Sequence, residues 1–523
     1  MRRAARNSPI KENFVDRAIS FFSPVRGAKR MRARLAMSIA NSFDGASKTR
    51  RSLKQWGALG LDADSDIIND LPELRNRSRD LVRNNPVAAG AIKTKVTNVI
   101  GSGLRLQSRI DRDVVGMDEE TADQWEKKTE REWRLFWESK DCDVARTCNG
   151  NSITRMVYRQ AKENGDVFIL LPGVEVKGFP YLTRLQVVES DRIDNPDHQP
   201  DTDRLVAGVV KDENGAPTAY HVAKYHPGNI LHGKAQSWRK VAAFGDKTGL
   251  RNVIHLYDPT RPGQTRGIPD LAAVIEPLKQ LGRYTEAEIM AAVISGFFTV
   301  FIESETGGIP HTGFDYSNFD YSAGQAGSDK DMKLGNGLII GLNKGEKIHD
   351  SNPGRPNQSF EPFVLAIMKQ VGTALEIPFE VLLKCFESSY SAARASINEF
   401  WKYVVAERKW LYDNFLILVY EIWMWEAVAL GRIVAPGFFS DPIIRKAYLG
   451  CDFTGPPKGQ INESVEVKAA SQRLSAGLST LARETAELTG GDWERNHEQQ
   501  KKEYDRRRKD GLIPDETKPI QNQ

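Results

Sequence analysis

The spacing of apolar residues predicts two strong helices on either side of a polar loop near residue 385. From Phe360 to Leu375 the apolar side chains recur at steps of three and four residues, which places them on one face of a helix. This helix is expected to end at Ile377, because the residue before Pro378 is driven out of the α region. The segment Lys384 to Tyr390 has no helical period, so it is predicted to form a loop.

The second helix is predicted to be long and apolar on more than one side. Ser391 is a plausible N-cap. The pattern then continues over 392–430, which is roughly 58 Å at about 1.5 Å per residue. Four tryptophans crowd its surface, at Trp401, Trp410, Trp423 and Trp425. Such a helix is expected to be buried against several neighbours, which are its own sheet in a monomer and also the next subunit in an oligomer.

Helices precede strands in the first half of the chain. Helices are predicted over 14–22, 71–100 with a break at 84–86, 119–137 and 151–164. From residue 166 the period changes to that of strands, over 167–171, 182–188, 205–210, 219–224 and 253–257, with a hairpin turn at 212–215. This order predicts an α+β fold with a mostly antiparallel sheet rather than repeating βαβ units.

The second half adds few strands. A long helix is predicted after Pro269, followed by strands over 297–302 and 338–342 that are separated by a glycine-rich loop. Two polar helices, over 463–488 and 493–509, end the predicted order.

Composition is that of an ordinary folded protein. The chain has 523 residues, of which 40% are hydrophobic and 27% charged, so it can bury more than one core. No segment reaches the length of a membrane span, and no membrane partner is expected. The N-terminus lacks the apolar stretch of a signal peptide, and the four cysteines show no metal-binding spacing, so synthesis in a reducing cytosol is expected.

Charge is distributed unevenly along the chain. The fourteen Lys and Arg and three Asp and Glu before residue 55 give this segment a formal charge of +11, so the remainder carries −7 of the net +4. This basic arm includes Arg26, Lys29, Arg30, Arg32 and Arg34. It is expected either to bind an anionic partner, nucleic acid or an acidic protein, or to be a solvated and partly disordered tail.

Motifs that carry chemistry are absent from the sequence. It has no GxxxxGK[ST] phosphate loop, HExxH metal motif or GxSxG elbow, and Gly101-Ser-Gly103 lacks the third glycine of a dinucleotide loop. His221 and His226 are not spaced to share a metal. Serines near Lys384 could suggest a Ser/Lys nucleophile, but a polar loop with a helix cap is favoured, because no base or oxyanion donor is evident. Neither an enzyme nor a cofactor or metal is therefore expected.

Four separated sequence blocks resemble the lambda family of phage portal proteins. They are RSRDLVRNNP at 77–86 with Gly101-Ser-Gly103, VIHLY at 253–257 with RPGQTRGIP at 261–269, the region from PGRPN at 353–357 through IPFE at 377–380 to YSAAR at 390–394, and the ending at 493–512. The blocks occur in the family's order and span about residues 70 to 512.

This resemblance implies a portal-type α+β fold. Its parts would be a basic and partly disordered N-terminal arm at 1–60, a wing of helices then antiparallel sheet at 61–265, a first stem helix at 266–295, a β-containing clip at 296–356, a second stem helix at 357–376, a tunnel loop at 377–391, a long helix returning to the wing at 392–455, and a C-terminal helical crown at 456–523.

The resemblance also implies a function without catalysis. Such a protein forms a ring, usually of twelve copies, at one capsid vertex. The ring conducts double-stranded DNA without sequence specificity during packaging and ejection. Expected partners are the terminase large subunit, head-completion or tail connector proteins, and the major capsid or scaffold protein. The protein would assemble in the cytoplasm of a host bacterium and become part of the virion.

Candidate site residues follow from the implied ring. We expect Lys369, Lys384, Ser388, Ser389 and Tyr390 to line the DNA tunnel, and Arg261, Arg266, Arg355 and Arg394 to act in loops between elements or subunits. Lys384 could instead face a neighbouring subunit. Two other classes compete with the portal: a terminase or nuclease, which the missing phosphate loop and carboxylate cluster argue against, and a DNA-associated capsid or scaffolding protein without a channel.

Overall fold

The computed structural model describes residues 14–39, 46, 50–53, 55–229, 236–296, 300–303, 339–342, 359–386, 389–460 and 462–512. The chain divides into two compact units, 1–62 and 63–523. In the described part of the first unit, α1 (Phe14–Phe22) and α2 (Pro24–Ile39) form a helical hairpin. The helix predicted over 14–22 is confirmed. Among the described residues, no helix is both long and apolar enough to cross a membrane.

The second unit begins with the expected helices. They are α3 (Ala63–Ile67), α4 (Leu71–Asn84), α5 (Pro86–Val99), α6 (Arg112–Val115), α7 (Glu119–Trp137) and α8 (Gly150–Asn164). The break between α4 and α5 is confirmed, and Asn85 explains it, because its side chain accepts hydrogen bonds from Val87 N and Ala88 N and so caps the second helix. A short strand that the pattern did not predict, β1 (Arg105–Ser108), follows α5.

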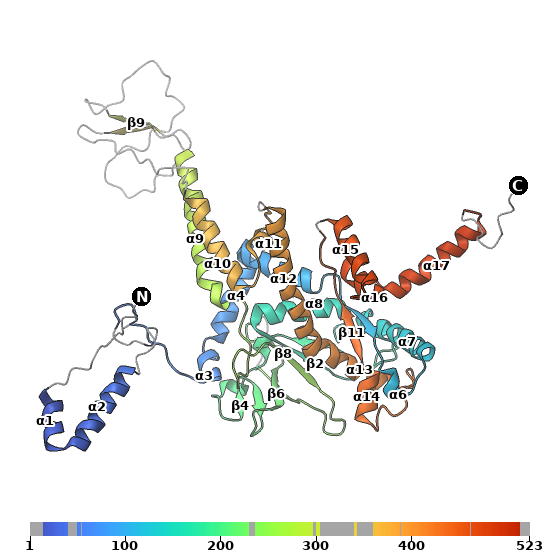
Figure 1. Ribbon diagram of the computed structural model, residues 1–523, viewed down its shortest axis with the longest axis horizontal. Coiled ribbons are helices and arrows are strands. Elements are labelled where there is room, and N and C mark those ends of the chain that lie inside the picture. Colours follow the sequence, from blue (N-terminus) through green and yellow to red (C-terminus); the bar gives the residue numbers. More distant parts are fainter. Residues whose placement is uncertain are drawn as a thin grey trace, which may run out of the picture. The chain divides into compact units, whose positions relative to one another are not determined.

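Two antiparallel sheets follow α8, as Figure 1 shows. The first has the order β3-β2-β8, from β2 (Asp166–Leu170), β3 (Gln186–Val188) and β8 (Val253–Tyr257). The second has the order β4-β5-β6-β7, from β4 (Leu205–Val206), β5 (Val209–Lys211), β6 (Pro217–Ala223) and β7 (Trp238–Ala242). Phe168, Val188, Val222 and Val253 are buried together in a core that both sheets share. The predicted antiparallel character is confirmed, although β7 was not predicted.

The prediction of one strand over 205–210 is wrong. Ala207 and Gly208 both have positive φ angles, 44° and 83°, so the chain turns there and separates β4 from β5. Gly208 leaves no room for a side chain, because a Cβ would lie 2.5 Å from Asp194 N. The strand predicted over 182–188 is also shorter than expected. Glu426 accepts hydrogen bonds from Leu182 N and Thr183 N, so these backbone N–H groups have partners without pairing with a neighbouring strand.

A helix pair and a small parallel sheet follow β8. After a 3-10 turn, α9 (Ile275–Gly296) packs against α10 (Phe360–Ala374), with the Tyr284 ring 5.5 Å from Phe360 and 5.2 Å from Phe363. Between these helices in sequence, β9 (Val300–Glu303) pairs in parallel with β10 (Ile339–Leu342). Most of the predicted clip, including Arg355, lies outside the described residues.

The long second helix is confirmed. It consists of α12 (Tyr390–Leu411), a π-helical segment η6 (Tyr412–Leu416) and α13 (Ile417–Ala429). The expectation of burial on several sides is also confirmed for α13. Trp423 is fully buried, with its ring 5.1 Å from that of Trp133 on α7.

The C-terminal part differs in detail from the prediction. It contains α14 (Pro442–Tyr448), β11 (Cys451–Thr454), α15 (Glu463–Ser475), α16 (Leu481–Thr489) and α17 (Trp493–Lys509). The single helix predicted over 463–488 is wrong, because Gly477, with a φ of 68°, ends α15 and a new helix starts after Thr480. β11 pairs antiparallel with β1, which is distant in sequence.

Candidate functional site

The predicted loop begins with a tight turn after α10. Glu376 has a φ of 55°, and the backbone N–H of Ile377 donates to Gly372 O at 2.9 Å. A Cβ on Gly372 would lie 2.6 Å from Ile377 O, so only glycine permits this approach. Because the Ile377 side chain is buried, the turn is fixed on the body of the protein.

A single helical turn then presents Lys384 to solvent. α11 (Phe379–Leu383) starts after Pro378 and ends where Lys384 adopts a left-handed conformation, with φ 56° and ψ 34°. Its side chain is exposed, and so is that of Phe386. The left-handed conformation of Lys384 ends α11, so its side chain projects from a helix end with a defined backbone geometry.

The loop closes on a cap that differs from the expected one. The prediction that Ser391 caps the second helix is wrong, because the Ser389 side chain accepts a hydrogen bond from Ala392 N and the helix starts at Tyr390. Ser389 and Tyr390 are exposed next to the loop. Ser388 lies outside the described residues.

Lys369 occupies a separate position. Its ammonium group lies 5.3 Å from the ring centroid of Phe379, at the opposite end of α11 from Lys384. The two lysines border different features. Lys369 lines a groove of about 860 Å³ between α10, α11 and α12, whereas Lys384 lies on the exposed loop. The groove is also lined by Glu376, Phe379, Glu399, Phe400 and Tyr403.

Of the four arginines expected to act in loops, the three that the structure describes are not brought together. Arg266 is buried, whereas Arg261 forms an exposed ion pair with Asp66 at 3.0 Å. Arg394 joins the first turns of α12 to α15 through Glu466 at 2.8 Å. Among these three described arginines, Arg266 alone is therefore held in a polar network at the centre of the fold.

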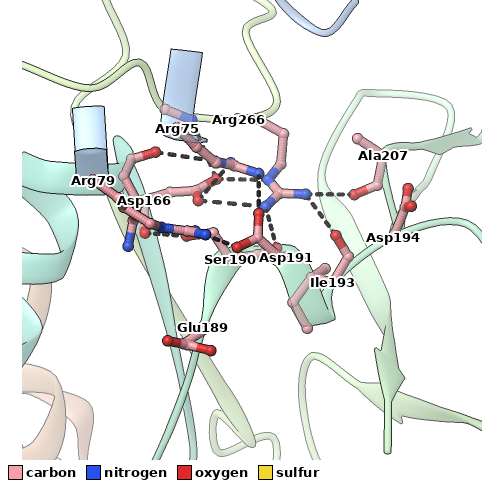
Figure 2. Close-up of polar contacts among 12 residues, drawn as sticks. Arg75, Arg79, Asp166, Glu189, Ser190, Asp191, Ile193, Asp194, Ala207 and Arg266 are labelled. Atoms are coloured by element: carbon pink, nitrogen blue, oxygen red, sulfur yellow. Dashed lines mark hydrogen bonds and ion pairs between the residues drawn. The ribbon is translucent and has the colours of Figure 1, made fainter. Parts of the chain in front are cut away.

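Figure 2 shows that Arg266 and Asp166 form a buried centre between the two sheets. Arg266 Nε and Nη2 donate to the Asp166 carboxylate at 2.6 and 3.3 Å. Its remaining N–H groups reach three backbone carbonyls, Ser190 O at 2.9 Å, Ile193 O at 2.9 Å and Ala207 O at 2.8 Å. One guanidinium thus fixes the segment after β3 and the β4–β5 turn against the start of β2.

Two more groups complete this centre. Arg75 on α4 donates to Asp166 Oδ1 at 2.8 Å, and His255 Nε2 lies 3.4 Å from Asp166 Oδ2. Burial by itself raises the pKa of Asp166, but the Arg266 and then the Arg75 guanidinium outweigh it and hold that pKa well below its usual range. Burial lowers the pKa of Arg75 to about 10, so Arg75 is still charged at pH 7.

Two glycines allow this close approach. Gly267 follows Arg266, and a Cβ there would lie 2.0 Å from Gly165 O, while a Cβ on Gly165 would lie 2.4 Å from Gly267 O. The motif at 261–269 contains Arg266 and Gly267, but Asp166 and Arg75 were not identified as its partners. The only signal for Asp166 was an acidic residue directly before an otherwise apolar strand.

The basic arm is only partly described. Arg26, Lys29, Arg30 and Arg32 lie on α2 and are exposed, and Arg34 lies on the same helix. Within the described ranges, no group of three or more His, Cys, Asp or Glu is placed to hold a metal ion. The arrangement found is one of exposed cations, a fixed loop and a buried structural ion network.

Comparison with known proteins gives one consistent result. The family model described as "Phage portal protein, lambda family" matches residues 49–408. The chain is 26% identical over 499 residues to portal protein B of Escherichia phage lambda, covering 91% of each chain. It is also 26% identical over 482 residues to the portal protein of Escherichia phage N15, covering 88% of this chain and 89% of that one.

Similar solved structures come from gene transfer agent (GTA) particles. A chain from the neck of an empty particle, computed with C6 symmetry, has a TM-score of 0.38 at 13% identity, covering 84% of this chain and 99% of that one. A chain from the neck of a native particle, computed with C12 symmetry, also has a TM-score of 0.38, at 14% identity, covering 80% of this chain and 93% of that one.

Proposed function

The chain belongs to the lambda family of phage portal proteins, and from this premise we propose how its described residues serve a DNA conduit. The observation that carries the proposal is the family match over 49–408, which includes the turn after α10, α11 and most of α12. As a portal protein it is a component of the virion, and its family is structural rather than enzymatic. We infer a ring, most simply of twelve copies.

In this ring the loop between α10 and α12 narrows the channel. Lys384, Ser389 and Tyr390 are exposed side chains on a loop whose two ends are fixed, by the buried Ile377 and by the Ser389 cap. Ser388 belongs to the same proposal by its position in the sequence. Each residue of a ring is repeated in every copy, so one Lys384 becomes a circle of positive charge.

A sparse ring of cations suits a conduit. Contacts to phosphates carry no sequence information, and their strength grows with the number of phosphates neutralised. One lysine per copy gives phosphate contacts without sequence specificity, and contacts of this kind let a duplex slide. Lys369 is assigned to the tunnel less directly, because it lies over Phe379 at the groove.

The remaining partners are part of the same proposal. Double-stranded DNA would pass through the ring, the terminase large subunit would bind the clip at 296–356 during packaging, and head-completion or tail connector proteins would bind it later. The major capsid or scaffold protein would surround the ring. Assembly would take place in the cytoplasm of the host bacterium.

Two experiments test the proposal in order. Negative-stain images of the purified full-length protein should show rings with a central hole, and particles without a hole would favour a capsid or scaffolding protein. Rings of the Lys384→Ala variant should form normally, but packaging or retention of DNA in assembled heads should change. If packaging and retention of DNA are both unchanged, Lys384 does not line the channel.

A matched control separates the loop from general loss of charge. Lys409 on α12 is 66% exposed at its side chain and pairs with Asp413, so Lys409→Ala removes the same charge from a surface outside the groove that Lys369 lines. This control should behave as the unsubstituted protein in both assays. If both variants changed packaging equally, net charge rather than the position of Lys384 would be responsible.

A further inference from the structure

The α1–α2 hairpin exposes an apolar face that the rest of the described first unit does not cover. Phe14, Phe21 and Phe22 on α1 are exposed to 87%, 82% and 85% of their surface, and Val25 at the start of α2 to 70%. Large aromatic side chains are rarely left so open on a soluble protein without a partner. The hairpin precedes residues 49–408, which match the family model, so this face lies outside the matched part.

The apolar residues form one stripe on α1. At 3.6 residues per turn, Phe14, Ala18, Phe21 and Phe22 are spaced by four, seven and eight positions and share a face. Ser20 lies on the opposite face, where it meets α2, because a Cβ on Gly27 would lie 2.3 Å from Ser20 Oγ. The hairpin therefore closes through small residues and turns its phenylalanines outward.

Exposed cations accompany this stripe on the second helix. Arg26, Lys29 and Arg32 are exposed on α2, which lies alongside α1. Packed helices are about 8–10 Å apart. An apolar helix lying in a bilayer interface is buried by about 5–10 Å, so α2 would stand at the level of the lipid phosphates.

We propose that this hairpin binds the surface of an anionic phospholipid bilayer, with α1 in the interface and α2 over the headgroups. A DNA duplex would use the cations but leave the phenylalanines in water, whereas an anionic bilayer uses both. The absence of a membrane partner expected from the sequence rested on the lack of a spanning segment, and an interfacial helix does not need one. The proposal is independent of the channel.

The test is flotation of the full-length protein with vesicles of 30% phosphatidylglycerol in phosphatidylcholine, and with vesicles of phosphatidylcholine alone. We expect binding to the anionic vesicles that weakens in 0.5 M NaCl. The Phe21→Ser/Phe22→Ser variant should bind at least about tenfold more weakly, because it removes apolar area from the interface. Arg26→Glu/Lys29→Glu should lose the preference for anionic lipid.

The control is Leu478→Ser/Leu481→Ser, which removes two exposed apolar side chains from the crown, 74% and 49% exposed, and should bind vesicles normally. The two phenylalanine substitutions face away from Gly27, so the hairpin should still form.

Three results would overturn the proposal. The first is equal binding, or no binding, to the two vesicle types. The second is unchanged binding of the double-serine variant. The third is loss of ring formation or of DNA binding by that variant instead of loss of vesicle binding, which would assign the face to a second copy of the chain or to nucleic acid. Rings are scored by negative stain, so failure here leaves the portal role untouched.

Discussion

Replacing Arg266 by methionine should loosen the β3-β2-β8 and β4-β5-β6-β7 sheets more than any exposed arginine could. Arg266→Met keeps an unbranched apolar stem but removes five hydrogen bonds, two to Asp166 and three to the carbonyls of Ser190, Ile193 and Ala207. The Asp166 side chain is fully buried, so its charge cannot turn to water.

The expected cost follows from this geometry. Removing one partner of a buried ion pair costs about 3–5 kcal/mol, since the remaining charge stays buried. Arg75 still donates to Asp166 in the variant, which places the effect toward the lower end of that range. At about 1.4 kcal/mol per factor of ten, opening of the sheets becomes roughly 140- to 3,700-fold more frequent.

Hydrogen exchange measures this opening directly. Backbone amides of β2 and β8 lie in the sheet beside Asp166, so their exchange should accelerate by the predicted factor, while those of α17 should not change. Arg261→Met is the matched control, because its ion pair with Asp66 is exposed and such pairs contribute about 0–1 kcal/mol. Acceleration of less than about tenfold at β2 would refute the assigned role of Arg266.

The pH dependence gives a second check on the same variant. The pKa of Asp166 is lower in the folded than in the unfolded protein, so the carboxylate stabilises the fold above about pH 4, and this contribution is lost as the pH falls through the folded value. Without Arg266 that pKa is held down less strongly, so the variant loses less on acidification. The difference in stability between the two proteins should be widest at pH 7 and should narrow as the pH falls below about 4. A constant difference would contradict the electrostatic explanation.

Three further substitutions test other parts of the fold. Gly267→Ala should destabilise the second unit by more than about 2 kcal/mol, measured by urea unfolding, because its Cβ would meet Gly165 O at 2.0 Å. Full stability would show that the loop can shift. Burial raises the pKa of Glu126 to about 7, so ionisation of Glu126 lowers the stability of the fold as the pH rises from about 5 to 8. Glu126→Gln can still accept a hydrogen bond from Ile110 N, and its melting temperature should depend less on pH over that range. An unchanged pH dependence of the melting temperature would contradict this. Arg408→Met removes three hydrogen bonds to backbone carbonyls and should lower the melting temperature. An unchanged melting temperature would show that water can replace the guanidinium.

The helical framework could be predicted from the sequence because its signals are local. Pro86 after a capping asparagine separates α4 from α5, and the apolar period over 119–137 gives α7 its bounds. The same reasoning failed where one residue had to adopt an unusual conformation. Ala207 is not a residue whose sequence context announces a positive φ, so the β4–β5 turn was missed.

The candidate loop was found by the same local logic, as a segment without period between two helices. Its position in sequence and the family resemblance pointed to Lys384, and the structure adds that this lysine is exposed in a left-handed conformation at a helix end. The cap at Ser389 rather than Ser391 could not be predicted, because both are serines within one turn and only the backbone angles distinguish them.

The sequence by itself determined most of the long helices, the family and the loop. Only the tertiary structure decided which distant residues meet. Asp166 and Arg266 are 100 residues apart, and β1 (Arg105–Ser108) and β11 (Cys451–Thr454) lie still further apart in sequence, yet each pair is in direct contact. A local pattern records whether a side chain belongs inside a helix or a strand, but not which of many arginines will reach a buried carboxylate. That choice depends on how the sheets and α4 pack together, because only the assembled fold brings the guanidinium groups to the carboxylate and excludes water from it.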